Sequence, residues 1–285
     1  MSDIWYLLRD YERYVYHYTR GATLATHILP TGRLRFSRFE GVNDPRESKE
    51  WALSFISGTH LDPDYAALEL RLNEALKHTW RIGCFVQDSP DAVMTGRDER
   101  GSETLRRAYK RGHSRPRMWA QYAERYSGAC LVFDRAKLDA SVRSVPTERV
   151  YCGAVKYLDP SPVPRLGKSE ALTFSLLNAD DADLDAAANR HIEQHKDDLF
   201  FRKVEDWQHE CELRWAAQSR DAGDFYVPVD GSLVGIALGE DFAPGAKTAV
   251  AAFGEANPTV SIAFMGWQNG FPQPKPTHWR ILAAS

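Results

Sequence analysis

The sequence predicts one α+β domain with a mixed, mostly antiparallel sheet and flanking helices. Short runs that alternate apolar and polar residues, as strands do, are interspersed with segments in which apolar residues recur at helical spacing. No repeat with a period of about 20–50 residues is visible. The 285 residues are 43% hydrophobic, which is enough for a sizeable core. We therefore expect residues 1–285 to form a single domain, with an Arg-rich insertion at 89–117 and a surface tail at 266–285.

The composition argues against several classes of protein. A formal net charge of −3 does not indicate a nucleic-acid binder over the whole chain. No apolar run of about 18 residues predicts a membrane span, and the first residues lack the basic and apolar regions of a signal peptide. The cysteines form no C-x-x-C pair. Reduced, buried thiols in a cytoplasmic protein are therefore expected. The cysteines are Cys84, Cys130, Cys152 and Cys211.

The N-terminal segment is expected to form a strand, a short helix, a glycine turn and a second strand. An amphipathic helix over residues 1–14 precedes this unit. The strands are Val15–Tyr18 and Leu34–Phe36, and the helix between them is Arg20–Thr31. Strand ends are where a sheet presents side chains to a cleft. The polar side chains at these strand ends are His17, Thr19, Arg35 and Ser37.

A turn follows at Asn43-Asp44-Pro45. Asp44 is expected to cap a short helix that begins at Pro45, because proline is favoured at the first helical position. The alternative is a loop that holds the phosphates or ribose of a ligand through Asn43 and Arg46. A guanidinium group matches phosphate oxygens in a bidentate way.

The remaining elements follow from the same periodicities. The expected helices are one capped by Asp62 that includes Leu68 and Leu76, then Pro116–Tyr126, Glu170–Leu177, one that ends near Lys203, and Ala246–Phe253. The expected strands are Trp80–Val86, Gly128–Phe133, Val150–Tyr157, Tyr226–Val229, Leu233–Leu238 and Thr259–Phe264. Trp119 and Tyr122 are three residues apart and share a helix face. They belong either to the core or to the wall of a pocket for a flat ring.

Residues 89–117 are the one basic region of the chain. They form either a solvated insertion or a contact for a polyanionic partner such as nucleic acid, through Arg97–Arg117. Tyr109 is the only Phe, Trp or Tyr in the segment. A base-stacking platform is therefore not expected.

The most informative stretch is Phe200–Trp215. Its second half alternates charged with neutral residues, a period of two that predicts a strand with its charges on one face. Those charges are Glu210, Glu212 and Arg214. Such a face is costly to bury without purpose. It forms either a solvated ladder of ion pairs or the lining of a polar cleft in which a carboxylate stabilises positive charge or takes a proton.

Several ligand-binding motifs are absent. There is no G-x-G-x-x-G, no G-x-x-x-x-G-K-[ST] and no G-x-S-x-G. No H-E-x-x-H exists either, and His191 and His195, four residues apart, are expected on a solvated helix face. No metal site is expected.

A set of short motifs spans most of the chain, from Tyr16 to about Gly239. They include Tyr-His-Tyr-Thr at 16–19, Asn-Asp-Pro-x-Glu at 43–47, Met-Trp-x-x-Tyr at 118–122, Val-x-Tyr at 155–157 and Lys-x-x-x-Trp-x-x-Glu-x-Glu-x-Arg at 203–214. Together they resemble the bacterial domain-of-unknown-function family 2971. The family implies no activity. The chain departs from it at Arg46, where the family often has an aromatic residue.

The start of the chain has a more distant likeness. A strand with His-x-Thr, a helix ending in Ile-Leu, a glycine and a second strand are similar to the opening of DarT-type DNA ADP-ribosyltransferases and RNA 2′-phosphotransferases. The resemblance implies a split sheet that grips NAD in a cleft. It also implies that His17 contacts the NAD ribose with Tyr18 and Thr19 beside it, that Phe36 stacks on nicotinamide, and that Glu210 or Glu212 is the catalytic carboxylate.

The resemblance leads to the hypothesis of an NAD-dependent ADP-ribosyltransferase, a toxin-like or phage-defence effector that modifies nucleic acid or protein. NAD is its substrate, and a partner or antitoxin protein is an open possibility. Two alternatives are a metal-dependent nuclease and a non-catalytic sensor or interaction module. The nuclease would use Asp44, Glu47, Glu210 and Glu212 as ligands. Further candidate NAD contacts are Arg35, Phe36, Ser37, Asn43, Arg46, Trp119 and Tyr122.

Overall fold

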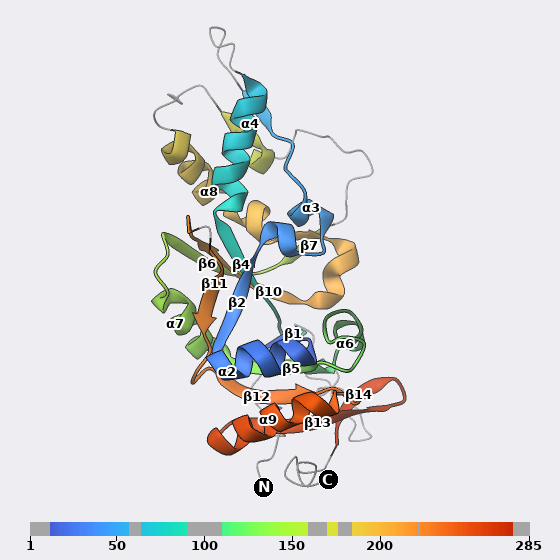
Figure 1. The fold of residues 1–285 in the computed structure, drawn as a ribbon. Helices are drawn as coiled ribbons and strands as arrows, with labels where there is room; N and C mark the ends of the chain where they lie inside the picture. The colour runs from blue at the N-terminus through green and yellow to red at the C-terminus, as the bar shows by residue number, and fades with distance from the viewer. Residues whose placement is uncertain are drawn as a thin grey trace.

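The computed structural model describes residues 12–56, 64–89, 110–158, 170–175, 184–221 and 223–275. These residues form a main sheet with helices along it (Figure 1). One pair of strands in the main sheet is parallel and the others are antiparallel. The prediction of an α+β fold with a mixed, mostly antiparallel sheet is confirmed.

The strands form one large sheet and two small ones. The main sheet contains β1 (Tyr14–Thr19), β2 (Arg33–Arg38), β4 (Trp80–Val86), β5 (Ala129–Asp134), β6 (Arg149–Ala154), β10 (Glu212–Gln218), β11 (Phe225–Pro228), β12 (Leu233–Leu238), β13 (Ser261–Gln268) and β14 (Phe271–Pro274). Two small parallel sheets consist of β3 (Ser54–Ile56) with β8 (Thr173–Ser175) and of β7 (Lys156–Leu158) with β9 (Arg202–Val204).

The helices are mostly short. They are α1 (Gly21–Thr23), η2 (Leu24–Ile28) and α2 (Leu29–Thr31) in one run, then α3 (Pro45–Ser48), α4 (Tyr65–Asn73) with η4 (Glu74–His78), α6 (Pro116–Tyr122), α7 (Arg135–Ser144), α8 (Leu184–Phe200) and α9 (Pro244–Ala256). The 3-10 helices are η3 (Phe39–Gly41), η6 (Gly112–Ser114), η7 (Glu170–Leu172) and the longer η9 (Glu205–Glu210). Figure 1 places α4 and α8 at one end of the molecule and α9 with β12–β14 at the other.

The sheet is split beside β4. On one side β4 pairs with β10 along its whole length. On its other side, β2 pairs with its beginning, with Ser37 opposite Ile82, and β1 pairs with its end, with Tyr16 opposite Val86. Because two strands share this side of β4, they must diverge from each other beside the middle of the strand.

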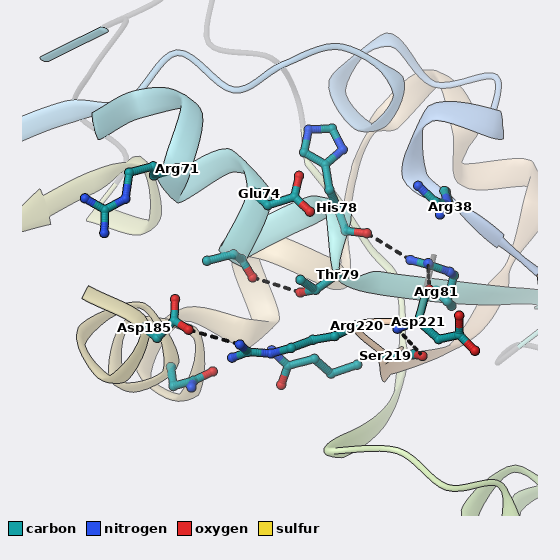
Figure 2. A pocket seen from close by; sticks show the side chains of 13 residues that line it. Arg38, Arg71, Glu74, His78, Thr79, Arg81, Asp185, Ser219, Arg220 and Asp221 are labelled. Carbon is teal, nitrogen blue, oxygen red and sulfur yellow. Dashed lines mark hydrogen bonds and ion pairs between the residues drawn. The ribbon is translucent and has the colours of Figure 1, made fainter. Parts of the chain in front are cut away.

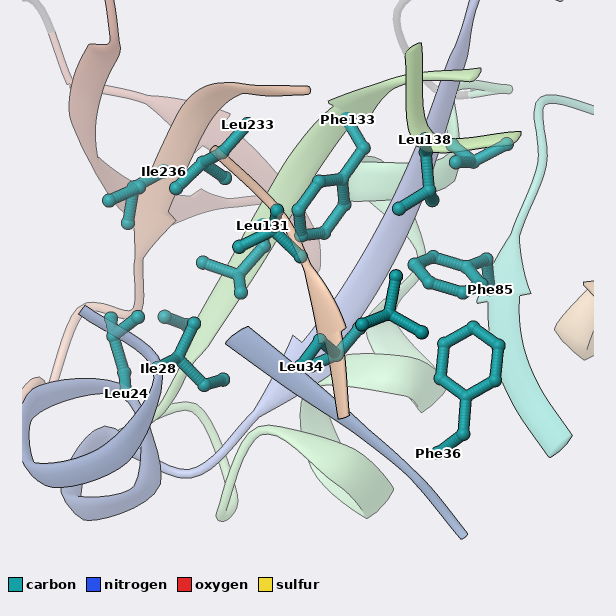
Figure 3. Packing of buried hydrophobic residues seen from close by; sticks show 14 of the residues in the cluster. Leu24, Ile28, Leu34, Phe36, Phe85, Leu131, Phe133, Leu138, Leu233 and Ile236 are labelled. Atoms are coloured by element: carbon teal, nitrogen blue, oxygen red, sulfur yellow. The ribbon is translucent and has the colours of Figure 1, made fainter. Parts of the chain in front are cut away.

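Three apolar clusters hold the sheet and helices together. In the largest, Leu24 and Ile28 of the first helical run pack toward Leu131 of β5 and Ile236 of β12 (Figure 3). A second cluster joins α4, η4 and α8 to the beginning of β4, and a third joins α6 to β1 and β5. Burying apolar surface stabilises these contacts by about 25 cal/mol per Å².

Several helix ends follow the predicted turn chemistry. The Asp44 side chain accepts a hydrogen bond from the backbone N–H of Arg46 at 2.9 Å, so its capping role is confirmed. The first helical run ends at Gly32, whose φ of 60° is left-handed. The cap of α4 is Asp64, because its carboxylate accepts from the N–H groups of Ala66 and Ala67. Asp62, the predicted cap, lies outside the described residues.

Other expectations need correction. Where a helix was expected at Glu170–Leu177, the chain forms η7 and then β8, in which buried Phe174 is flanked by residues that face outward. The helix expected to reach Tyr126 ends at Tyr122, because Glu124, Arg125 and Tyr126 have φ values of 49°, 51° and 75°. Residues 266–274 of the expected tail belong to β13 and β14. Residues 276–285 of that tail and residues 1–11 of the helix expected near the N-terminus lie outside the described residues, and residues 12–14 form a turn and the start of β1.

Residue 83, in the middle of β4, must be glycine because the Phe36 ring lies directly against it. A Cβ added there would lie 2.3 Å from the Phe36 ring, which is 1% exposed and has no free space to enter. We predict that Gly83→Ala lowers the free energy of unfolding by about 1–3 kcal/mol, measured by urea denaturation. Gly245→Ala in α9 is the control, because nothing lies within 4 Å of its added Cβ. Equal effects of the two substitutions would contradict this packing.

Candidate functional site

A cavity of about 400 Å³ opens where β1 and β2 diverge beside β4. Segments from both ends of the chain line it. They include His17, Tyr18, Arg35, Ser37, Asn43, Cys84, Tyr122, Lys203, Glu210 and Glu212. The volume lies in the range of small-molecule sites, which is about 300–1,000 Å³. We call this space the split-sheet cavity.

Five buried charged side chains lie at one side of the split-sheet cavity. Lys203 Nζ is 2.8 Å from Glu210 and 2.7 Å from Glu212. Arg214 Nε donates to Glu212 at 2.7 Å, and Arg214 Nη1 lies 2.6 Å from Glu47 while it donates to the Phe200 carbonyl. Each of the five is at most 6% exposed. We call Glu47, Lys203, Glu210, Glu212 and Arg214 the buried charge cluster.

A change of backbone direction at Cys211 brings the two cavity glutamates to one lysine. η9 ends at Cys211, whose φ of 44° is left-handed, and β10 begins at the next residue. Glu212 and Arg214 therefore lie on one face of a strand, as predicted. The prediction is wrong for Glu210, which precedes the strand and reaches Lys203 from the 3-10 turn.

The buried charge cluster contains three carboxylates and two cations. Burial alone would raise the pKa of the Glu212 carboxyl, but Arg214 and Lys203 lower it to about 2. Burial raises the pKa of Glu47, which the same two cations only partly offset. Burial would lower the pKa of Lys203, but Glu212 and Glu47 raise it above its ordinary value. With Lys203 and Arg214 charged, ionisation of all three carboxylates leaves a formal charge of −1 beside the cavity.

Two tyrosines orient the glutamates. The Tyr122 hydroxyl donates to Glu210 Oε1 at 2.5 Å, and burial followed by Glu210 raises the pKa of this phenol. The Tyr157 hydroxyl accepts a hydrogen bond from the backbone N–H of Glu212 at 2.9 Å. Tyr122 was a predicted site residue, whereas Tyr157 was not. The only signal for Tyr157 in the sequence was the Val-x-Tyr motif at 155–157, one of those that resemble family 2971.

His17 lies at the junction of two cavities. Its Nδ1 is 3.1 Å from the Cys84 carbonyl, and its ring packs against Phe85. A carbonyl can only accept, so Nδ1 carries the hydrogen and Nε2 carries the lone pair in the neutral ring. Burial lowers the pKa of His17 and favours that neutral form.

The second cavity has a volume of about 690 Å³ and adjoins the first through shared residues. His17, Arg35 and Ser37 line both spaces, while Thr19 and Tyr226 line the second alone. Arg35 also lies 3.6 Å from Asp224 in an exposed ion pair. We call the two adjoining spaces along the diverging strands the channel.

Three predicted NAD contacts lie away from both cavities. Phe36 is buried against Phe85 and Phe225, so it cannot stack on a ligand ring. Trp119 is fully buried, and its indole N–H donates to the His113 carbonyl. Arg46 turns toward the end of α8 and donates to the carbonyls of Asp198 and Arg202. Tyr18 lines the cavity, but its hydroxyl is occupied by the Gly112 carbonyl.

Part of the Arg-rich segment has a structural role. Arg111 is fully buried and lies 2.9 Å from Asp88 in an ion pair. The N–H of Ser89 donates to the Lys110 carbonyl, so the two sides of the segment meet. Arg115 donates to the carbonyl of His209, next to Glu210. The expected nucleic-acid contact over Arg97–Arg117 falls mostly on residues 90–109, which lie outside the described residues.

The described residues hold no group of three or more His, Cys, Asp or Glu side chains that could bind a metal ion. His191 is 9% exposed, and its Nε2 bonds to the Ala171 carbonyl, so the expectation of a solvated face is wrong for this residue. The four cysteines are free, but only Cys130 is buried. In the same part of the chain, no helix combines the length and apolar character that crossing a membrane requires.

The fold and cavity define an α+β protein with a buried charge cluster beside a split sheet. Residues 118–215 match the model of the family described as protein of unknown function (DUF2971), which confirms the family resemblance. The matched range includes Tyr122, Lys203, both cavity glutamates and Arg214. No curated protein and no solved structure matches the chain.

Removing the central cation should destabilise the fold. Lys203→Met leaves three buried carboxylates with Arg214 alone, and we predict a loss of about 3–5 kcal/mol in the free energy of unfolding. Lys156→Met is the matched control, because Lys156 is 69% exposed in its pair with Asp197 and should contribute less than about 1 kcal/mol. Similar losses in the two variants would contradict the role of Lys203.

The depressed pKa of Glu212 predicts a pH dependence. Because its folded-state pKa is about 2 and its ordinary value is 4.5, its contribution to stability is present above about pH 4.5 and is lost as pH falls toward 2. The difference in the free energy of unfolding between wild type and Glu212→Gln should therefore shrink across this window. Urea denaturation at several pH values measures it, and a constant difference would refute the assignment.

Proposed function

We propose that this protein is an NAD-dependent ADP-ribosyltransferase. The observation that carries the proposal is that His17 and the glutamates Glu210 and Glu212, far apart in the sequence, line one polar cavity. The distant likeness to DarT-type enzymes assigns these residue types to the NAD ribose and to the catalytic carboxylate.

The channel supports the binding part of the proposal. The two adjoining spaces have volumes of about 400 and 690 Å³, a scale suited to an extended dinucleotide. In the proposed complex His17 Nε2 accepts a hydrogen bond from a ribose hydroxyl. Arg35 lines both spaces and is positioned to contact the diphosphate. Tyr122 takes the place of Phe36 and Trp119 as the aromatic side chain beside nicotinamide.

The reaction needs stabilisation of positive charge. The bond from the nicotinamide nitrogen to the ribose carbon breaks, nicotinamide leaves with the bonding electrons, and a nucleophile of the acceptor forms a new bond to that carbon. The ribose becomes cationic on the way, and the ionised carboxylate of Glu212 at the cavity favours that state. A cavity glutamate takes the proton of the acceptor. Glu212, whose pKa is held low by Arg214 and Lys203, suits the stabilising role, which leaves Glu210 as the proton acceptor.

The two alternatives fit the same residues less well. A nuclease would need Asp44, Glu47, Glu210 and Glu212 as metal ligands. Asp44 caps α3 instead, and Lys203 and Arg214 pair with the three glutamates. In a non-catalytic module the cluster would be purely structural, yet two of its carboxylates line an open cavity. The proposal includes a role as a toxin-like or phage-defence effector that modifies nucleic acid or protein.

Transfer of label from NAD tests the proposal. Purified protein, labelled NAD and candidate nucleic-acid or protein acceptors should yield labelled acceptor. Glu210→Gln or Glu212→Gln should reduce the rate by about 10²–10³, the usual effect of removing one electrostatic stabiliser. Glu255→Gln, on an exposed position of α9, is the charge-matched control and should leave the rate unchanged.

Three outcomes would overturn the proposal. Label transfer that survives both glutamine variants would remove the glutamates from catalysis. Nucleic-acid cleavage that requires Mg²⁺ and ignores NAD would favour the nuclease. A lower melting temperature in Glu210→Ala, with no reaction in the wild type, would favour the interaction module.

A further inference from the structure

A third, polar pocket lies at the beginning of β4. Its volume is about 280 Å³, and it shares no lining residue with the split-sheet cavity. β2, β4, η4 and the segment after β10 surround it (Figure 2). Arg81 at the beginning of β4 lines this pocket, while Ile82 to Val86 of the same strand line the split-sheet cavity.

Arg81 is a buried cation whose hydrogen bonds go to neutral groups. It is 2% exposed. Its guanidinium donates to the backbone carbonyls of His78, Trp80 and Asp221, at 2.9, 3.3 and 2.7 Å. Within the described residues no carboxylate forms an ion pair with it. Asp221, Glu40 and Glu74 act on Arg81 only through their more distant charges.

A second arginine faces the first. Arg38 of β2 is the register partner of Arg81 in β4, so their side chains leave the sheet side by side. Figure 2 shows both guanidinium groups in the pocket. Like charges at opposed positions destabilise a pair of strands. Burial and the charge of Arg38 both lower the pKa of Arg81. An anion between the two groups would remove this repulsion.

The rest of the pocket carries charges of both signs. Four arginines and three carboxylates line it. Arg220 is already paired with Asp185 and Glu148, each at 3.0 Å. The Ser219 hydroxyl oxygen accepts from the N–H of Asp221 at 3.3 Å and keeps its own hydrogen for donation.

We propose that this pocket binds a phosphate group, with Arg38, Arg81 and Ser219 as its principal ligands. Guanidinium groups offer planar pairs of N–H donors that match phosphate oxygens, and a hydroxyl supplies a further donor. The group belongs either to inorganic phosphate or to a small phosphate monoester. The proposal does not depend on the proposed transferase activity, because the two sites share no residue.

Isothermal titration of the full chain tests the site. Inorganic phosphate and adenosine monophosphate are titrated separately, with chloride at matched ionic strength as the reference. Saturable binding of phosphate is expected, and Arg38→Gln should weaken it about tenfold or more, the scale of one lost charge-assisted hydrogen bond. Tighter binding of adenosine monophosphate than of phosphate identifies a monoester as the ligand, and equal or weaker binding identifies the free ion.

Controls keep the test decisive. Arg135→Gln removes one exposed positive charge at the start of α7, outside the pocket, and should bind phosphate as the wild type does. If Arg38→Gln does not fold by circular dichroism, Ser219→Ala replaces it, with a loss of about threefold to tenfold expected for one neutral hydrogen bond. Absence of saturable binding by the wild type, or unchanged affinity in the folded pocket variant, overturns the proposal.

Discussion

The structure of the cavity depends on the ion pairs that Lys203 and Arg214 make with three buried glutamates. Those side chains come from α3, β9, η9 and β10, so the cluster joins segments that the sheet ladder alone would not hold together. Burying a carboxylate without a cation costs several kcal/mol, which fixes the partners as a set. Buried ion pairs seldom stabilise a fold more than apolar residues of the same volume would. Their position beside an open cavity is better explained by a ligand.

The divergence of β1 and β2 provides the space for the proposed ligand. Both strands pair with the same side of β4, one at each end, and His17 lies on the strand nearer to the Glu212 end. Gly83 lets the Phe36 ring lie against the middle of β4, which fills the core behind the opening. The channel is thus bounded by apolar packing on one side and by the buried charge cluster on another.

Local patterns predicted the elements better than the site. Strand β4 and strand β12 were bounded correctly, because alternation and flanking turns specify them. The helix predicted at 170–177 was wrong. Residues 173–175 form β8, whose pairing partner β3 lies more than a hundred residues earlier and leaves no local signal. His17, Glu210 and Glu212 were predicted to share one cavity because of the distant resemblance to ADP-ribosyltransferases, and all three line it. Phe36, Trp119 and Arg46 were wrongly expected to contact NAD, because neither resemblance nor periodicity nor the chemistry of a side chain shows which neighbours cover it in the folded chain. Glu47 was considered only as a metal ligand, and its ion pair with Arg214 depends on tertiary contacts.

We propose that the space between the diverging strands holds NAD against His17 and the buried charge cluster. The most direct measurement is the unfolding temperature of the purified protein over a series of NAD concentrations, for the wild type and for His17→Ala. A ligand of the folded state must raise that temperature as its concentration rises. The account predicts a rise for the wild type and a much smaller one for the variant. No rise in the wild type at millimolar NAD, or an equal rise in both proteins, would contradict it.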